Sequence, residues 1–153
     1  MRWMTVVATL LTMSSLAARA ESQPENRYGV IVDLREYPQD TPKHALESVL
    51  KAIGDRRIDY LLAHLADPQW VDKRVQDNHG GKFDEFVKET ASKLANEPES
   101  VKQLRRFLKE GEWEESAANA TARLKDVKER VYLRKIKERW YLENRKNAEK
   151  AEK

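Results

Sequence analysis

The clearest structural signal in the chain lies in residues 45–68, ALESVLKAIGDRRIDYLLAHLADP. Apolar residues recur there at three- and four-residue spacing on both sides of Gly54, which predicts two short amphipathic helices joined at that glycine. Thr41-Pro42 suits the N-cap and first position of the first helix, and Asp55 suits the N-cap of the second. The second helix should end at Asp67-Pro68, because the residue before a proline disfavours helical backbone.

The helical pattern continues downstream of this pair. A helical turn around Trp70 is predicted to end at Gly80-Gly81, a further helix begins near Lys82, and another opens at Pro98 and ends before Gly111. Upstream, Tyr28–Leu34 (YGVIVDL) is apolar and rich in β-branched residues, which is typical of a short strand or an extended arm.

After Gly111 the apolar residues recur with a period of two. The stretches Ala118–Leu124, Val131–Ile136 and Trp140–Glu143 together predict a C-terminal antiparallel three-stranded meander, so the fold class is α+β. An alternative interpretation makes Asp126–Lys150 one basic helix, because some of its apolar residues also fit helical spacing.

Residues 1–20 are predicted to be a signal peptide. Arg2 supplies a positive start, Met4–Leu16 is an apolar stretch too short to span a bilayer, and Ala18-Arg19-Ala20 forms a cleavage site before Glu21. The mature protein is therefore expected to be exported, to the periplasm or the extracellular space. No later segment is apolar enough to predict a membrane span.

The remaining 133 residues are enough for one domain, which we divide into an extended arm (21–37), an α+β domain (38–146) and a charged tail (147–153). The mature chain holds 27 basic and 26 acidic residues, a formal charge of +1 that gives little reason to expect a nucleic-acid partner. The absence of cysteine excludes disulfides, thiol catalysis and thiolate metal sites.

Two segments carry a resemblance to a known family. The segment SVLKAIGDRRIDYLLAHLADP (48–68) and the closing VYLRKIKERWYLENR (131–145) resemble the NTF2-like superfamily, and the closing segment is similar to small exported, uncharacterised, planctomycete-like bacterial members. The resemblance covers residues 38–146. It implies a cone in which a curved sheet wraps the first long helix and leaves a pocket at its open end. Some relatives place an Asp or His base in that pocket and others only bind ligands, and no catalytic residue is carried over.

Catalytic groups are sparse in this sequence. Of the three histidines, His64 lies beside an apolar helix face, where it could act as a base oriented by Asp59 or Asp67, or could simply be a structural histidine. The first reading corresponds to a cofactor-independent lyase, isomerase or hydrolase, and the residues leave open whether the domain is an enzyme. No histidine pair, calcium loop or phosphate loop is present, so no metal or cofactor is predicted.

The function that the sequence favours is a binding or scaffolding module for a small molecule or a protein. Aromatic residues and His64 are the candidates for a ligand pocket, although packing in the core explains large aromatic residues equally well. The candidate ligand-binding residues are Tyr60, His64, Trp70, Tyr132 and Trp140. Two further expectations are a homodimer formed through the sheet and, as a third class of function, a basic interaction module in Lys125–Lys153. Export argues against a nucleic-acid ligand.

Overall fold

The chain forms helices first and an antiparallel sheet last, so the α+β class is confirmed. The structure is a computed structural model that describes residues 23–145; the predicted leader (1–20) and charged tail (147–153) lie outside the described residues. The helices are α1 (Pro42–Gly54), α2 (Ile58–Tyr60), the π-helix η1 (Leu61–Leu65), α3 (Pro68–His79), α4 (Phe83–Asn96) and α5 (Pro98–Glu110). The strands are β1 (Asn26–Arg27), β2 (Val30–Ile31), β3 (Glu112–Glu115), β4 (Asn119–Arg123), β5 (Arg130–Ile136) and β6 (Arg139–Leu142).

Helix α1 begins where the sequence predicted. The Thr41 hydroxyl accepts a hydrogen bond from the backbone N–H of His44 at 3.1 Å, and Pro42 occupies the first turn. On the apolar face of the helix, Ala45, Leu46, Val49 and Ala52 are fully buried. The cap satisfies one of the backbone donors that every helix leaves open at its N-terminus.

Replacing Thr41 with alanine should lower the free energy of unfolding by about 1 kcal/mol, because the N–H of His44 loses its acceptor. Thr41→Ser keeps a hydroxyl in the same place and should unfold close to the wild type. Urea unfolding followed by circular dichroism measures both variants. Equal midpoints for the alanine and serine variants would mean that the cap does not stabilise α1.

The connection from α1 into η1 differs from the predicted pair of ordinary helices. Asp55 ends α1 instead of capping the second helix, and no side chain caps α2 at Arg57. The turn then widens, because the backbone N–H of Ala66 bonds the carbonyl of Leu61 five residues earlier, at 2.8 Å. All five residues of η1 are buried, so this segment has no solvent-facing side. The amphipathic α-helix predicted from residue 58 onward was therefore wrong over η1.

Helices α3, α4 and α5 agree with the sequence prediction and extend it. The turn expected around Trp70 is a full helix, with Asp67 as its N-cap and Gly80 at its C-terminal end. Gly80 and Gly81 have φ values of 57° and 86°, which glycine adopts without the penalty that a side chain would impose. The two glycines thus turn the chain from α3 into α4.

The sheet has four strands in the order β3-β4-β5-β6, one more than the predicted meander. The additional strand, β3, has the sequence EWEE, in which only Trp113 is apolar, so period-two hydrophobicity could not reveal it. Strand β5 pairs with β6 through Lys135↔Trp140, which shows that the alternative helix across 126–150 is wrong over its described part.

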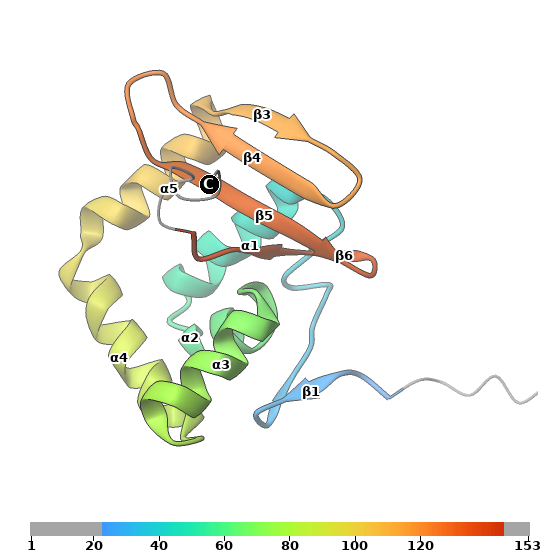
Figure 1. Cartoon of the computed structure of the whole chain (residues 1–153), viewed down its shortest axis with the longest axis vertical. Coiled ribbons are helices and arrows are strands. Elements are labelled where there is room, and N and C mark those ends of the chain that lie inside the picture. The colour runs from blue at the N-terminus through green and yellow to red at the C-terminus, as the bar shows by residue number, and fades with distance from the viewer. Residues whose placement is uncertain (1–22, 146–153) are drawn as a thin grey trace, which may run out of the picture.

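The two faces of the sheet differ in their surroundings. Ala120, Ala122, Val131 and Leu133 point to one face and join the core formed by the helices. Helix α1 contacts both β6 and α5, and Figure 1 shows it running behind the sheet, with α3 and α4 at the end of the molecule away from β3. The residues that alternate with these along the strands, including Tyr132, point to the opposite face of the sheet.

The N-terminal segment forms a small hairpin rather than one extended strand. β1 and β2 pair antiparallel through Arg27↔Val30, and the turn between them is Tyr28-Gly29. Both turn residues have positive φ, 54° for Tyr28 and 81° for Gly29, which is the backbone of a two-residue type I′ hairpin. In Figure 1 this hairpin lies beside α3, and Glu25, directly before β1, forms an ion pair with Arg139 of β6.

Candidate functional site

His64 is enclosed by the protein, and its ring holds a segment of backbone. The residue is fully buried, and Nε2 lies 2.7 Å from the carbonyl oxygen of Val30. In the neutral ring Nε2–H donates this bond; Nδ1 is buried and has no hydrogen-bond partner within residues 23–145. Burial lowers the pKa of His64 from its ordinary value of 6.5. A general base must reach its substrate, and this ring is closed off.

Tyr60 lies beside His64 and binds backbone through its hydroxyl, and the Trp140 N–H donates to the Gln39 carbonyl at 2.9 Å. The Tyr60 hydroxyl accepts from the Asp33 N–H at 2.9 Å and donates to the Asp33 carbonyl at 3.1 Å, and the Tyr60 and His64 ring centroids are 5.1 Å apart. Gln39, which the sequence analysis missed, is buried and donates through Nε2 to the carbonyls of His64 (2.9 Å) and Trp140 (2.8 Å). Its side chain therefore ties η1 to β6.

Trp70 and Tyr132 are found elsewhere in the molecule. The ring of Trp70 packs between α3 and α4, with its centroid 5.7 Å from that of Phe86. Tyr132 lies on the opposite face of the sheet, where the guanidinium carbon of Arg145 is 5.1 Å from the ring centroid, and it lines a separate hollow of about 180 Å³. The structure thus brings three of the five predicted ligand residues together, as framework, and separates the other two.

The carboxylates suggested as partners of His64 have other partners. Asp59 forms an ion pair with Arg57 at 2.9 Å. Asp67 accepts from the backbone N–H of Gln69 at 2.9 Å through Oδ1, and its Oδ2 lies 2.7 Å from Nη2 of Arg134. Asp67 therefore caps α3 and anchors that helix to β5.

The N-terminal arm, defined here as Glu25–Asp33, is bound to the helices by polar contacts. The Arg27 side chain donates to the carbonyl of Ala63 at 2.8 Å and to Asp72 at 2.6 Å. The Tyr28 hydroxyl donates to the same Asp72 oxygen at 2.6 Å, and burial together with this bond raises the pKa of Tyr28 to about 12. The arm is thus seated on η1 and α3.

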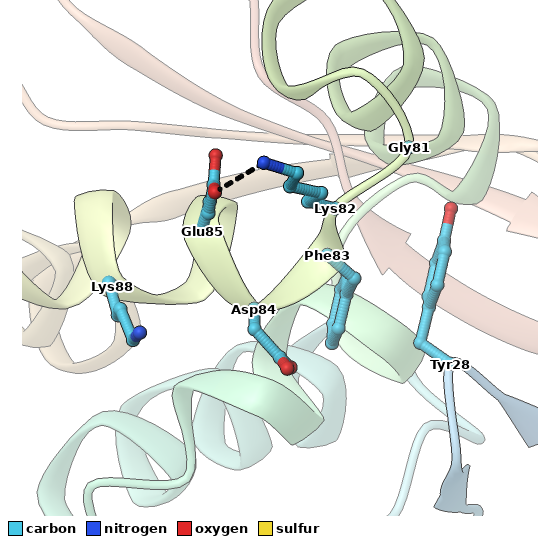
Figure 2. A pocket seen from close by; sticks show the side chains of 7 residues that line it. All are labelled: Tyr28, Gly81, Lys82, Phe83, Asp84, Glu85 and Lys88. Carbon is cyan, nitrogen blue, oxygen red and sulfur yellow. Dashed lines mark hydrogen bonds and ion pairs between the residues drawn. The ribbon is translucent and has the colours of Figure 1, made fainter.

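A hollow of about 530 Å³ opens where the arm turn meets the start of α4. Figure 2 shows the rings of Tyr28 and Phe83 lying parallel, with their centroids 4.1 Å apart. The charged side chains around them come from the first turns of α4, and Lys82 pairs with Glu85 at 3.1 Å. The lining residues are Tyr28, Gly81, Lys82, Phe83, Asp84, Glu85 and Lys88.

A second hollow, of about 420 Å³, lies along the other end of the arm. It is lined by Ile31, Val32, Asp33, Glu36, Tyr37, Arg57 and Tyr60. The large apolar side chains exposed in the described residues are Tyr28 at 40%, Ile31 at 57% and Leu34 at 46%. Of these, Tyr28 lines the first hollow and Ile31 the second. The stretch YGVIVDL signalled an apolar arm, but its alternation alone could not tell which residues face the solvent.

The basic segment Lys125–Lys153 is described as far as residue 145. Within that part Arg134 is paired with Asp67, and Arg139 forms an ion pair with Glu25. These two arginines therefore serve as anchors for α3 and for the arm.

The remaining findings concern metals, membranes and known proteins. Within residues 23–145, no group of three or more His, Cys, Asp or Glu side chains is placed to hold a metal ion. None of the helices in the same range has the length and apolar character needed to cross a membrane. Comparison of the chain with protein-family models, curated proteins and solved structures gave no match.

Proposed function

We propose that the protein is an exported binding or scaffolding module with an NTF2-like arrangement, and that it contacts a protein partner through its arm. The contact surface, which we call the arm face, consists of Tyr28 and Ile31 of the arm, Leu34 directly after it, and the two hollows along the arm. The observation that carries the proposal is the clustering of these three exposed apolar side chains in seven residues of one segment. Exposed apolar groups scattered singly need no explanation, whereas a cluster rimmed by charged residues is typical of an interaction site.

The order of elements supports the NTF2-like part of the proposal. The helices precede an antiparallel sheet whose strands follow one another in chain order, and α1 packs behind that sheet (Figure 1). The interior of the arrangement is filled where His64 lies, so we place binding on the outside. The proposed export rests on the signal-peptide pattern of residues 1–20.

The arm face is a better candidate for partner binding than the edge of the sheet. Strand β6, one edge of the sheet, already bonds the backbone of Gln39 and Asp67, and strand β3, the other edge, carries Glu112, Glu114 and Glu115. Arg123 pairs with Glu112 and Glu114, but two copies joined through β3 would still bring three carboxylates from each chain close together. Like charges across paired strands are destabilising. A homodimer through this edge is therefore disfavoured.

The arm face can be tested by photo-crosslinking in the cell that produces the protein. A benzoylphenylalanine at position 31 or 34 should yield a covalent adduct of defined mass. The same group at Lys102 or Lys125, whose side chains are 71% and 88% exposed, should yield none. Circular dichroism first checks that each variant is folded. Adducts of equal yield at all four positions, or at none, would contradict the arm face as the binding surface.

A matched substitution sharpens the same prediction. Ile31→Ser removes apolar surface from an exposed position, so it should leave the unfolding midpoint nearly unchanged and reduce the adduct formed at position 34. Lys102→Ser, on α5, is the control and should leave the adduct at position 34 intact. If both substitutions reduce the adduct equally, Ile31 has no special part in partner binding and the proposal fails.

A further inference from the structure

The centre of the arm is held by a single buried imidazole. The Val30 carbonyl accepts from Nε2 of His64 at 2.7 Å. On the N-terminal side of Val30, Arg27 donates to the Ala63 carbonyl at 2.8 Å and pairs with Asp72, the Tyr28 ring stacks on Phe83, and Glu25 pairs with Arg139. Asp33, at the end of the arm, is fixed by both backbone hydrogen bonds to Tyr60. The arm therefore has a firm attachment at Asp33 and a buried one at Val30, and its remaining contacts lie on the N-terminal side of Val30.

The surroundings of His64 accommodate only the neutral ring. A protonated imidazole donates from both nitrogens, but Nδ1 is buried and faces no acceptor in the described part of the chain. The charged groups that act on the ring are Glu25 and Arg27 from the arm and Arg139 from β6, two cations against one anion, with the uncharged Tyr60 ring alongside. A proton added here would be an uncompensated charge in a closed site, which proteins tolerate poorly.

We propose that the arm is an acid-sensitive latch: protonation of His64 releases Glu25–Val32 from the body of the protein while the helices and the four-stranded sheet stay folded. Asp33 is the hinge, because its two bonds to Tyr60 do not involve His64. The core is formed by residues from position 37 onward, and of the arm Val30 packs against it and Tyr28 stacks on Phe83 at its margin. Release of the arm therefore leaves the core in place.

The direction of the pH effect follows from the shift of His64. In the folded protein burial lowers the pKa of His64 by more than the hydrogen bond to the Val30 carbonyl raises it, so the chain with a released arm binds the proton more readily than the latched chain. The latch is fully closed above the ordinary pKa of 6.5 and weakens as the pH falls below it. This inference adds regulation to the proposed arm face, but it concerns the isolated protein, so either proposal can fail without the other.

Nuclear magnetic resonance of the chain from residue 21 tests the latch between pH 7.5 and 4. The ring nitrogen shifts of His64 report its protonation and its tautomer, and backbone amides report each segment. We expect the amides of Val30 and Ile31 to shift toward unstructured values with the midpoint of His64, while those of Ala122 and Leu133 stay folded. Amide exchange in the arm, corrected for its intrinsic pH dependence, should rise about tenfold for each pH unit through which the latch opens.

Variants separate His64 from the other acid-sensitive groups. His64→Gln retains an N–H donor for Val30 without a charge, so the arm should stay latched across the whole range. His44→Gln is the matched control, because His44 is exposed and pairs with Asp40 outside the arm, and release should be unchanged. Arm release that persists in His64→Gln would assign the effect to Glu25 or Asp72 and overturn the latch.

Two outcomes with the wild type alone are also decisive. Should His64→Gln fail to fold, coincidence of the His64 and arm midpoints still supports the latch, and separation of those midpoints contradicts it. Loss of the sheet signals at the same midpoint would mean that acid unfolds the whole domain, which also overturns the proposal.

Discussion

Replacing Gln39 with alanine should lower the free energy of unfolding by about 2–5 kcal/mol. The Gln39 amide is 2% exposed and donates to the buried carbonyls of His64 and Trp140, so its removal leaves both without this donor and opens a cavity. No other side chain in the described residues links η1 to β6 in this way. Urea unfolding followed by tryptophan fluorescence measures the loss.

Two further variants resolve the contributions at Gln39. Gln39→Met fills a similar volume without a donor, so it should lose most of the same stability if the hydrogen bonds dominate. Gln76→Ala removes the same side chain from an exposed position on α3 and should change stability by less than about 0.5 kcal/mol. If Gln39→Met unfolds like the wild type, the two hydrogen bonds contribute little and packing alone matters.

Asp67→Ala should cost about 2–4 kcal/mol, because one carboxylate performs two tasks. It caps α3 through the N–H of Gln69, and it neutralises Arg134 on β5 at 2.7 Å. Arg134 is about one third exposed, so solvent screens part of the ion pair and the estimate stays below that of a fully buried pair.

Asp67→Asn separates the two tasks. The amide oxygen can still cap α3, whereas the charge that Arg134 faces is lost, so this variant should unfold between the wild type and Asp67→Ala. A double-mutant cycle with Arg134→Met isolates the ion pair and should give a coupling of about 1 kcal/mol. A coupling of zero would leave the cap as the whole effect of Asp67.

Much of the fold could be predicted because local signals agree with the tertiary structure. Thr41-Pro42 does begin a helix, and the aromatic residues near the C-terminus do pair across strands. Strand β3 was not predicted, because pairing with β4, rather than its own hydrophobic pattern, makes EWEE a strand. The wide turn of η1 escaped for a similar reason, since burial on all sides overrides the usual helical period.

Less of the candidate site than of the fold could be predicted from the sequence. His64 was correctly seen beside apolar residues, but its partner proved to be the backbone of Val30, which has no sequence signature. Gln39 gave no signal either, because a lone glutamine before a helix is usually exposed. That Ile31 and Leu34 face outward depends on how the arm docks, which the alternation of residues 28–34 does not determine.

The bond between Gln39 and Trp140 also determines when the chain can fold during its synthesis. Its two ends are 101 residues apart in sequence, and the ion pair of Glu25 with Arg139 spans 114 residues. When only the helices have emerged from the ribosome, Trp140 and Arg139 have not yet been made. The nascent chain therefore cannot complete its core until the final hairpin emerges. The domain should therefore depend on holding factors for nearly the whole of its synthesis, and a stop codon before position 139 should send the product to proteases instead of leaving a stable helical fragment.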